Sequence, residues 1–291
     1  MVQALISQAM GDLISQKKAI EQFIESSSGD YDNLDLILGQ SGVLLSYAIL
    51  LDSAPYQSAS LYNFDCTQIF KLGNERMNVI WRKIDTYPSI RLGIDFSLLG
   101  MAHGWAGLLY ATLCWHVATD APLPLAFHQR VVELANCAET HGRGIRWRRD
   151  IADSHRRSRR GDYVASWCNG SAGMIYLWTM AHQVLGNQEY LELAILSAWD
   201  AIDSTDMGGD LCCGAGGVSY ALLNLYRHTQ DQTWLDQAKL LGERAAQASL
   251  GSPLSLYKGG VGVALLAVDL QHPMQAIMPL FELESKSLVS P

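Results

Sequence analysis

The chain has 291 residues, of which 49% are hydrophobic and 17% are charged, so it can bury a large globular core. Its net charge of −8 at pH 7 argues against nucleic acid as a partner, because phosphate binding needs a basic face. No apolar run approaches the roughly 18 residues of a membrane span, and the first residues lack the pattern of a secretion signal. We therefore expect a cytoplasmic protein.

A Gly-x-x-Gly motif followed by an apolar run recurs five times along the chain. Self-similarity of this kind is typical of an architecture built from one repeated supersecondary unit. The motifs begin at Gly39, Gly104, Gly170, Gly214 and Gly259, and subtracting successive numbers gives steps of 65, 66, 44 and 45 residues. A step near 45 residues fits two helices joined by a turn. The longer steps fit the same unit with a longer loop.

The expected helices alternate between two kinds. Each motif is followed by a run that is apolar nearly all round, which is typical of a helix buried on more than one side, and these runs should form an inner ring. Amphipathic segments should form an outer ring, and they lie near Leu5–Ile24, Thr67–Ile84, Leu125–Thr140, Gln188–Ile202 and Gln232–Ala248. No period-two strand pattern appears. The sequence thus predicts an all-α fold with a single domain over residues 1–291.

Three of the six cysteines lie within two residues before a motif glycine, Cys168 in WCNGSAG and Cys212 and Cys213 in LCCGAGG. Glycines at the helix starts permit close backbone approach, so the helix starts should crowd together and bring the thiols to one point. A structural zinc site normally has four protein ligands, whereas a catalytic one keeps three and leaves a position for substrate. Three thiolates therefore predict an open zinc site, and a helix N-terminus favours the thiolate form. The alternative is three small buried side chains.

The remaining cysteines are unevenly spaced in a long chain, so a disulfide framework is not expected. They sit singly in apolar or mixed helical patterns. Buried, inert thiols are the better interpretation for Cys66, Cys114 and Cys137.

Two further residues are candidates for the chemistry. His103 lies in GMAHGWAG, one residue before a motif glycine, which is also the place of Cys213 in its own motif. It could be a fourth zinc ligand, a general acid or base, or a helix-start residue bonded to the backbone, and an open zinc site favours proton transfer. Asp35, four residues before Gly39, could orient a histidine near the centre or could cap a helix.

The segment 141–162 carries eight arginines in an otherwise acidic chain. One interpretation is a solvated connection between helices. The other is a docking surface for an acidic segment or substrate, because the segment leads directly to Cys168.

The motifs GMAHGWAG, WCNGSAG, LCCGAGG and SLYKGGVGVALL, within residues 33–270, resemble those of the lanthionine synthetase C-like family of lanthipeptide cyclases. The resemblance implies an α,α-toroid that holds zinc and adds peptide cysteine thiols to dehydroalanine or dehydrobutyrine, forming thioether rings. By motif, Cys168, Cys212 and Cys213 match the zinc ligands, as in the three-cysteine cyclase domains of class II bifunctional lanthipeptide synthetases. His103 and Asp35 match the family's acid/base residues. A third thiolate should make a bound substrate thiolate more nucleophilic.

The chain departs from the family pattern in two ways. Many members have an arginine four residues before the first zinc cysteine, where this chain has Val164, so a cationic role would pass to another group such as Arg159 or Arg160. The family toroid has seven helical hairpins, whereas the five motifs predict five. This difference predicts a ring that is short at its N-terminal side, with an apolar edge that pairs with another copy or another polypeptide.

The sequence leaves the function open between three possibilities. As a cyclase, the protein would receive its dehydrated precursor peptide from a separate dehydratase, because no segment of the chain is long enough for a dehydratase domain. The second possibility is a non-catalytic zinc-binding scaffold for a peptide or a partner enzyme. The third is an enzyme that adds a small thiol such as glutathione.

Overall fold

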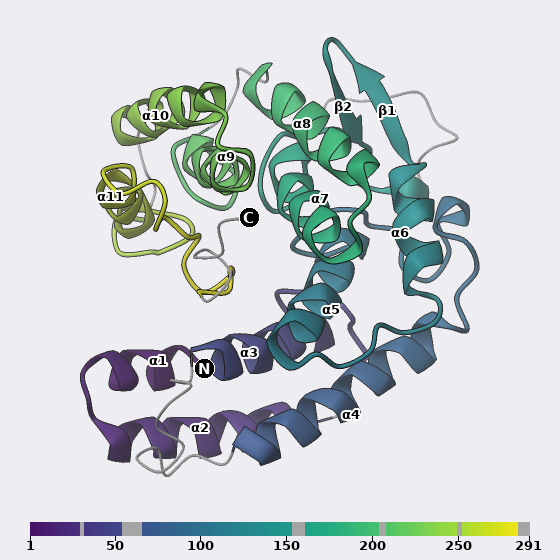
Figure 1. The fold of residues 1–291 in the computed structure, drawn as a ribbon, viewed down its shortest axis with the longest axis vertical. Coiled ribbons are helices and arrows are strands. Elements are labelled where there is room, and N and C mark those ends of the chain that lie inside the picture. Colours follow the sequence, from purple (N-terminus) through teal and green to yellow (C-terminus); the bar gives the residue numbers. More distant parts are fainter. Residues whose placement is uncertain (30–31, 54–65, 153–160, 204–207, 249–251, 285–291) are drawn as a thin grey trace.

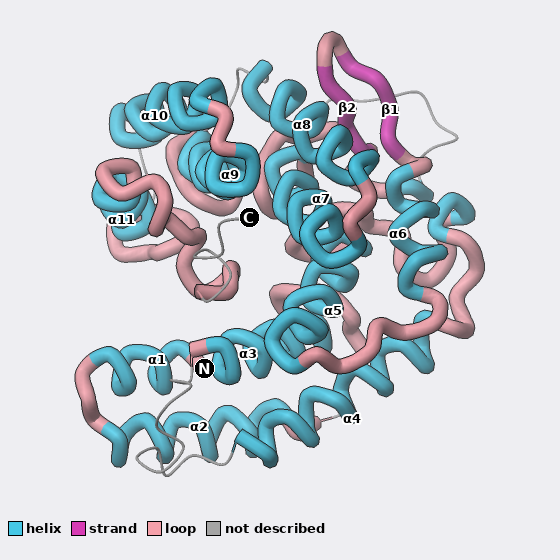
Figure 2. The backbone as a smooth tube through the Cα atoms, in the orientation of Figure 1, coloured by secondary structure: helices cyan, strands magenta, loops and turns pink. Residues whose placement is uncertain are grey.

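The computed structural model describes residues 1–29, 32–53, 66–152, 161–203, 208–248 and 252–284, and these residues are mostly helical (Figures 1 and 2). The elements in chain order are α1 (Val2–Ala9), α2 (Leu13–Ser27), α3 (Gln40–Asp52), α4 (Cys66–Ile84), the 3₁₀-helix η1 (Ile90–Leu92), α5 (Trp105–Thr119), α6 (Phe127–Ala135), β1 (Ala138–His141), β2 (Gly144–Trp147), α7 (Ser171–Leu185), α8 (Gln188–Asp203), α9 (Ala215–Thr229), α10 (Gln232–Gln247) and α11 (Gly260–Asp269).

The helices that follow the five motifs, α3, α5, α7, α9 and α11, form an inner layer, and α4, α6, α8 and α10 lie outside it (Figure 1). In α5 every residue from Trp105 to Trp115 is buried, as expected for a helix covered on several sides. Burying each large apolar side chain contributes about 1.5–3 kcal/mol, so these helices dominate the core. Helices α3, α5, α7 and α9 therefore agree with the hydrophobic pattern, whereas α11 buries only Gly262, Val263 and Leu266 and is less covered than expected.

The second glycine of a motif has a packing role. A Cβ atom at Gly173 would lie 2.2 Å from the carbonyl oxygen of Trp167, and one at Gly217 would lie 2.0 Å from that of Leu211. Both distances are well below van der Waals contact. The turn before each of these helices can fold back against the first helical turn because no side chain intervenes.

The structure differs from the sequence-based expectation at the N-terminus. The segment expected to be one helix from Leu5 to Ile24 is divided into α1 and α2. Gly11 adopts a φ of +70°, and Asp12 then caps α2 by accepting a hydrogen bond from the N–H of Ser15 at 3.0 Å. A left-handed glycine followed by an aspartate cap ends one helix and starts the next.

A short β-hairpin also departs from the predicted all-α fold. Strands β1 and β2 pair antiparallel, with Ala138 opposite Trp147 and His141 opposite Gly144. The chain reverses at Gly142, which has a φ of +56°. Each strand has four residues, which is too short for alternating hydrophobicity to be recognised. The tail of the segment expected to be helical up to Thr140 is therefore strand β1.

The segment after α11 returns to the inner layer. Phe281 is buried and stacks on Tyr110 of α5, with ring centroids 4.6 Å apart. Phe281 also makes edge-to-face contacts with Tyr176 and Trp167, with ring centroids 5.0 Å and 5.2 Å apart. Trp167 immediately precedes Cys168, so this aromatic cluster supports the turn that carries a predicted zinc ligand.

A buried ion pair anchors the same segment. Glu282 and Arg227 of α9 are paired, and each side chain is only 7% exposed. Glu282 also accepts hydrogen bonds from the side chain of Asn224 at 2.7 Å and from the N–H of Met278 at 2.6 Å. A buried carboxylate with three partners is well compensated for its lost hydration.

Among the described residues, none of the helices combines the length and apolar character that crossing a bilayer requires.

Candidate metal centre

The five turns that precede the inner helices contact one another through their main chains; we call them the motif turns (residues 35–39, 100–104, 166–170, 210–214 and 255–259). The residues two places before the first motif glycine form a hydrogen-bonded series. The N–H of Ala102 donates to the carbonyl of Cys168 at 2.7 Å, that of Cys168 to Cys212 at 3.2 Å, and that of Cys212 to Tyr257 at 2.9 Å. The repeat thus places Cys168 beside Cys212 in neighbouring turns.

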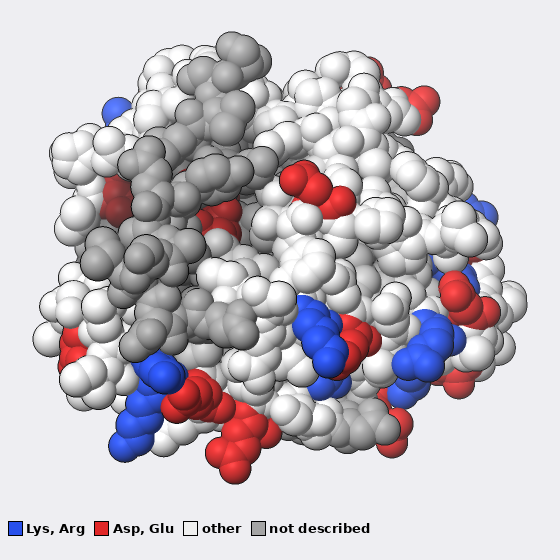
Figure 3. All heavy atoms as spheres, turned by 60° about the horizontal axis from the view of Figure 1, so that its bottom comes forward, with Lys and Arg blue, Asp and Glu red and all other residues white. Residues whose placement is uncertain are grey.

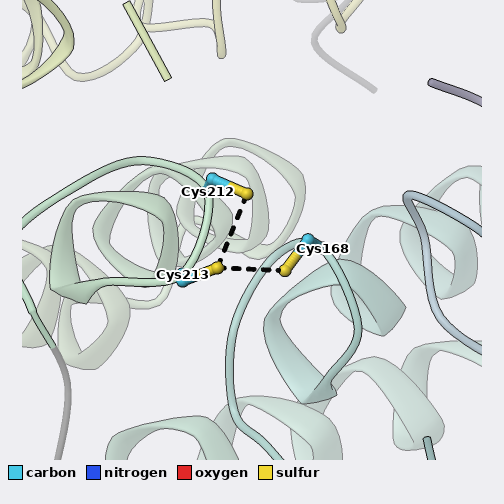
Figure 4. Close-up of side chains that lie close together, drawn as sticks. All are labelled: Cys168, Cys212 and Cys213. Carbon is cyan, nitrogen blue, oxygen red and sulfur yellow. Dashed lines mark hydrogen bonds between the residues drawn. The ribbon is translucent and has the colours of Figure 1, made fainter. Parts of the chain in front are cut away.

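The three predicted ligands meet as the sequence pattern indicated. Figure 4 shows their sulfur atoms pointing toward one another from the turns before α7 and α9. The Sγ atom of Cys213 lies 3.4 Å from that of Cys168 and 3.6 Å from that of Cys212, and all three lie within 4.8 Å of one another. Cys168 is buried, whereas Cys213 is exposed. The cluster is therefore accessible from one side.

The donor set fits a zinc ion. Tetrahedral zinc with Zn–S bonds of about 2.3 Å separates its sulfur ligands by roughly 3.8 Å, close to the 3.4 and 3.6 Å that separate the Cys213 sulfur from its two neighbours. Three thiols are also the soft donors that zinc prefers. A cluster of three would leave one tetrahedral position for another ligand.

The surroundings of the thiols favour a thiolate on Cys213. Hydrogen bonds with Cys168 and Cys212, followed by the hydrogen bond and charge of the Lys258 ammonium, lower the pKa of Cys213. The hydrogen bonds with Cys168 and Cys213 raise the pKa of Cys212, as does its partial burial. The two shifts describe one shared negative charge, and we assign it to Cys213 because its Sγ lies 2.9 Å from the Nζ atom of Lys258.

Sequence reasoning missed Lys258. The signal was available, because this residue stands one place before the first glycine of its motif. His103, Asn169 and Cys213 occupy the same place in the preceding three motifs. The repeat register that identified His103 as a candidate thus also identifies Lys258.

The structure brings Asp35 and His103 together. Oδ2 of the buried Asp35 lies 3.0 Å from Nδ1 of His103, whose side chain is 35% exposed and so remains accessible. Oδ1 of the same carboxylate accepts the N–H of Leu38 at 2.5 Å. Asp35 therefore stabilises its own turn, as Asp210 does by accepting the N–H of Cys213 at 2.6 Å, and also orients a histidine. The catalytic roles of the pair stay predictions.

The other cysteines lie outside the cluster. Cys114 and Cys137 are buried as expected, and burial raises the pKa of Cys114 well above its usual value and that of Cys137 to about 11. Cys66 is exposed at the start of α4, so the expectation that it is buried was wrong. Its position at a helix end explains the difference, because the apolar face of α4 begins one turn later.

The arginine-rich segment is partly described. Arg143 pairs with Asp203 and lies 3.8 Å from the ring of Trp199, and Arg148 pairs with Asp162 at 3.0 Å. These arginines are used in holding the β-hairpin and the following residues in place. Arg159 and Arg160, suggested as substitutes for a cation at Val164, lie outside the described residues.

Charges of both signs are mixed on the face of the molecule in Figure 3. Lysine and arginine side chains lie among aspartate and glutamate side chains there, with uncharged surface between them. A phosphate-binding surface would instead gather basic side chains on one face.

Comparisons with known proteins place the chain among related sequences and folds. Glutathione S-transferase LANCL1 of Danio rerio is 35% identical over 130 residues, which are 42% of this chain and 32% of that protein. LanC-like protein GCL1 of Arabidopsis thaliana is 23% identical over 204 residues, 63% of this chain and 43% of that protein. The matches thus span less than half the length of either relative.

The solved structure of nisin cyclase resembles this fold with a TM-score of 0.69 and 16% identity, covering 91% of this chain and 71% of that one. At this identity the likeness concerns the fold, an α,α-toroid. A family model described as "Lanthionine synthetase C-like protein" matches residues 2–283. Because that match spans nearly the whole chain, and the motif resemblance is thereby confirmed, the protein belongs to the lanthionine synthetase C-like family.

Proposed function

We propose that the protein is a zinc-dependent enzyme that adds a peptide cysteine thiol to a dehydroalanine or dehydrobutyrine residue and so closes a thioether ring. The observation that carries the proposal is the convergence of three thiols within 4.8 Å on the same set of motif turns that holds the His103–Asp35 pair. A thiol-activating site and a proton-transfer group are the two parts that this addition needs.

The cysteine cluster would hold the metal. A zinc ion there would supply the positive charge that keeps a substrate thiol, with an ordinary pKa of about 8.5, deprotonated near neutral pH. Three protein ligands, Cys168, Cys212 and Cys213, leave room for that thiol. Their exposed side, at Cys213, is where a peptide would approach.

His103 would donate the proton that completes the addition. In the addition, the thiolate sulfur bonds to the β-carbon of the dehydro residue, and the electrons of the double bond move to the α-carbon and its carbonyl. The α-carbon then gains one proton, which balances the one lost by the thiol. Because the carboxylate of Asp35 holds Nδ1 of His103, Nε2 is the nitrogen that delivers it.

The direct test is a synthetic peptide that contains one dehydroalanine and one cysteine. Ring closure leaves the mass unchanged but removes the free thiol, so alkylation with N-ethylmaleimide distinguishes the ring from the starting peptide. We expect zinc-loaded protein to close the ring and chelator-treated protein to be inactive. Zinc-loaded protein that binds the peptide without consuming its thiol would instead be the non-catalytic scaffold.

Addition of a small thiol is a second candidate, favoured by the 35% identity to a protein named glutathione S-transferase. The same site chemistry would serve it. A dehydroalanine peptide without cysteine, incubated with glutathione, would gain the mass of one glutathione. When the peptide carries its own cysteine and glutathione is also present, the product formed faster identifies the natural thiol.

We also propose that the ring of helices is incomplete and that its apolar ends associate with a second copy of the chain. Figure 1 shows the first and last helices, α1 and α11, on the same side of the molecule. Helix α11 exposes Val261, Leu265 and Val268, whose spacing places them on one helix face. An exposed row of this kind normally marks an interface.

A second apolar surface lies at the motif turn before α3, the first of the five motif turns. The motif turn before α3 exposes Ile37 and Leu38, by 51% and 71%, beside a pocket of about 360 Å³ that Phe23 and Val43 help to line. At equivalent places the later motif turns carry residues of the proposed site. This first turn offers hydrophobic surface instead, which suits the proposed contact with α11 of a second copy.

Sedimentation of the purified chain is expected to show a dimer or larger assembly at micromolar concentration. Leu38→Asp and Val268→Glu should each shift it toward monomer, because a charge buried at an apolar contact loses its hydration. Leu125→Asp, at a fully exposed leucine outside both surfaces, is the matched control and should change nothing. A monomeric wild-type chain that binds no apolar dye would contradict this proposal.

A further inference from the structure

We propose that Lys258 is a positioning residue whose ammonium group compensates the charge of the three-cysteine cluster and so allows the cluster to accept a substrate thiolate. Its Nζ atom lies 2.9 Å from Sγ of Cys213, the most exposed of the three thiols. The inference rests on the proposed function, since it takes the cysteines as zinc ligands. It adds a residue to which neither the motif analysis nor the comparisons assign a role.

The fold anchors the backbone at Lys258 through its own N–H and through the preceding residue. Its own N–H donates to Oγ of Ser255 at 3.0 Å, the same turn contact that Asp210 provides for Cys213. The preceding residue, Tyr257, accepts the N–H of Cys212 and donates its hydroxyl to the carbonyl of Pro279 at 2.8 Å. The lysine therefore starts from a fixed place beside the cluster, and the hydrogen-bonded series of motif turns places it there.

Charge counting gives the contact a purpose. Three thiolates carry three negative charges, and a zinc ion carries two positive ones, so the loaded centre has a net charge of −1. A substrate thiolate would bring it to −2. A zinc site with two thiolates and a neutral histidine would instead have a net charge of 0, and of −1 with the substrate thiolate bound. The chain thus has one extra anionic ligand, Cys213, and an ammonium group in contact with that same ligand.

A lysine suits this task for a physical reason. An ammonium group is a compact point charge with three donors, so it can bond to the sulfur of Cys213 and keep donors for other partners. Groups that hydrogen-bond to metal ligands typically change affinity about 10–100-fold when they are removed. We expect an effect of that size on the binding of a thiol.

The test uses the full chain loaded with Co²⁺, whose thiolate absorption bands report the ligand set. N-acetylcysteine amide, a thiol without a carboxylate, is titrated into wild type, Lys258→Met, Lys258→Arg and Lys239→Met. We expect Lys258→Met to raise the dissociation constant of the thiol about 10–100-fold. Lys258→Arg should restore most of the affinity, and Lys239→Met, on the exposed face of α10, should match wild type.

The outcomes separate this inference from the proposed function. A wild-type chain that binds no Co²⁺ would contradict the metal site itself. Equal thiol affinity in wild type and Lys258→Met would overturn the inference alone. A parallel titration with glutathione, whose carboxylates are negative, gives a further outcome. If Lys258→Met weakened the binding of glutathione but not that of the amide, Lys258 would be a carboxylate-binding residue and charge compensation would be wrong.

A second background isolates the third thiolate. In Cys213→His the ligand is neutral, so removing the lysine charge should then weaken binding of N-acetylcysteine amide less than it does in wild type. An undiminished effect in this background would overturn the assignment of Lys258 to the extra charge.

Discussion

Replacing Cys168 by alanine is expected to lower the zinc content from about one equivalent per chain to a small fraction of that. Cys168 is the buried member of the cluster and comes from a different motif turn than Cys212 and Cys213. Without it, two adjacent thiols remain, and a zinc site needs three or four protein ligands. The loss should exceed the 10–100-fold typical of residues that only support a ligand. Metal analysis after dialysis is the measurement.

A matched control separates metal binding from folding. Cys66→Ala removes an exposed thiol outside the cluster and should keep the full equivalent of zinc. The helical circular dichroism of Cys168→Ala should match wild type, because alanine is smaller than cysteine and introduces no steric clash in the turn before α7. Full zinc occupancy in Cys168→Ala would show that the cluster is not the metal site.

Replacing His103 by asparagine is expected to slow thioether formation by about 10²–10⁴-fold, the usual effect of losing a general acid. Asparagine can still donate a hydrogen bond to Asp35, but it cannot transfer a proton. Zinc content should stay at one equivalent, because His103 is not needed as a ligand when three cysteines are present. The single-turnover rate of ring closure and metal analysis of the same sample measure both quantities.

His116→Asn is the matched control for this variant. His116 lies near the opposite end of α5, about 20 Å from His103 at 1.5 Å per helical residue, and its Nδ1 contacts the carbonyl of Ala121. Its replacement should leave the rate of ring closure unchanged. If His103→Asn lost zinc together with activity, His103 would be a ligand and the cluster would not be an open three-cysteine site.

Much of the fold follows from local sequence. Each motif glycine precedes an inner helix because a glycine permits the tight turn and an apolar run favours burial on several sides, and both properties are readable within about fifteen residues. The meeting of Cys168 with Cys212 and Cys213 was also predictable. Repeated units place equivalent residues at equivalent points of a ring, so the position of a residue within its repeat predicts where it lies in the ring.

Other features depend on contacts between distant segments, which local patterns do not encode. Phe281 packs against Tyr110 although 171 residues separate them, and no feature of the sequence around either residue indicates the partner. The break at Gly11 and the β-hairpin at Gly142 were missed because one left-handed glycine outweighs the surrounding helical propensity. Both features are visible only in the backbone conformation of the folded chain.

The candidate site shows the same division between sequence and structure. The motif register in the sequence identifies which residues lie at the motif turns, including Lys258, and predicts that these turns are neighbours. Whether a side chain reaches its neighbour was decided by tertiary packing, as for Nζ of Lys258 at Cys213 and for Asp35 at His103. The physical reason is that a hydrogen bond depends on ångström-scale placement of two side chains, whereas sequence periodicity specifies only which turns lie side by side.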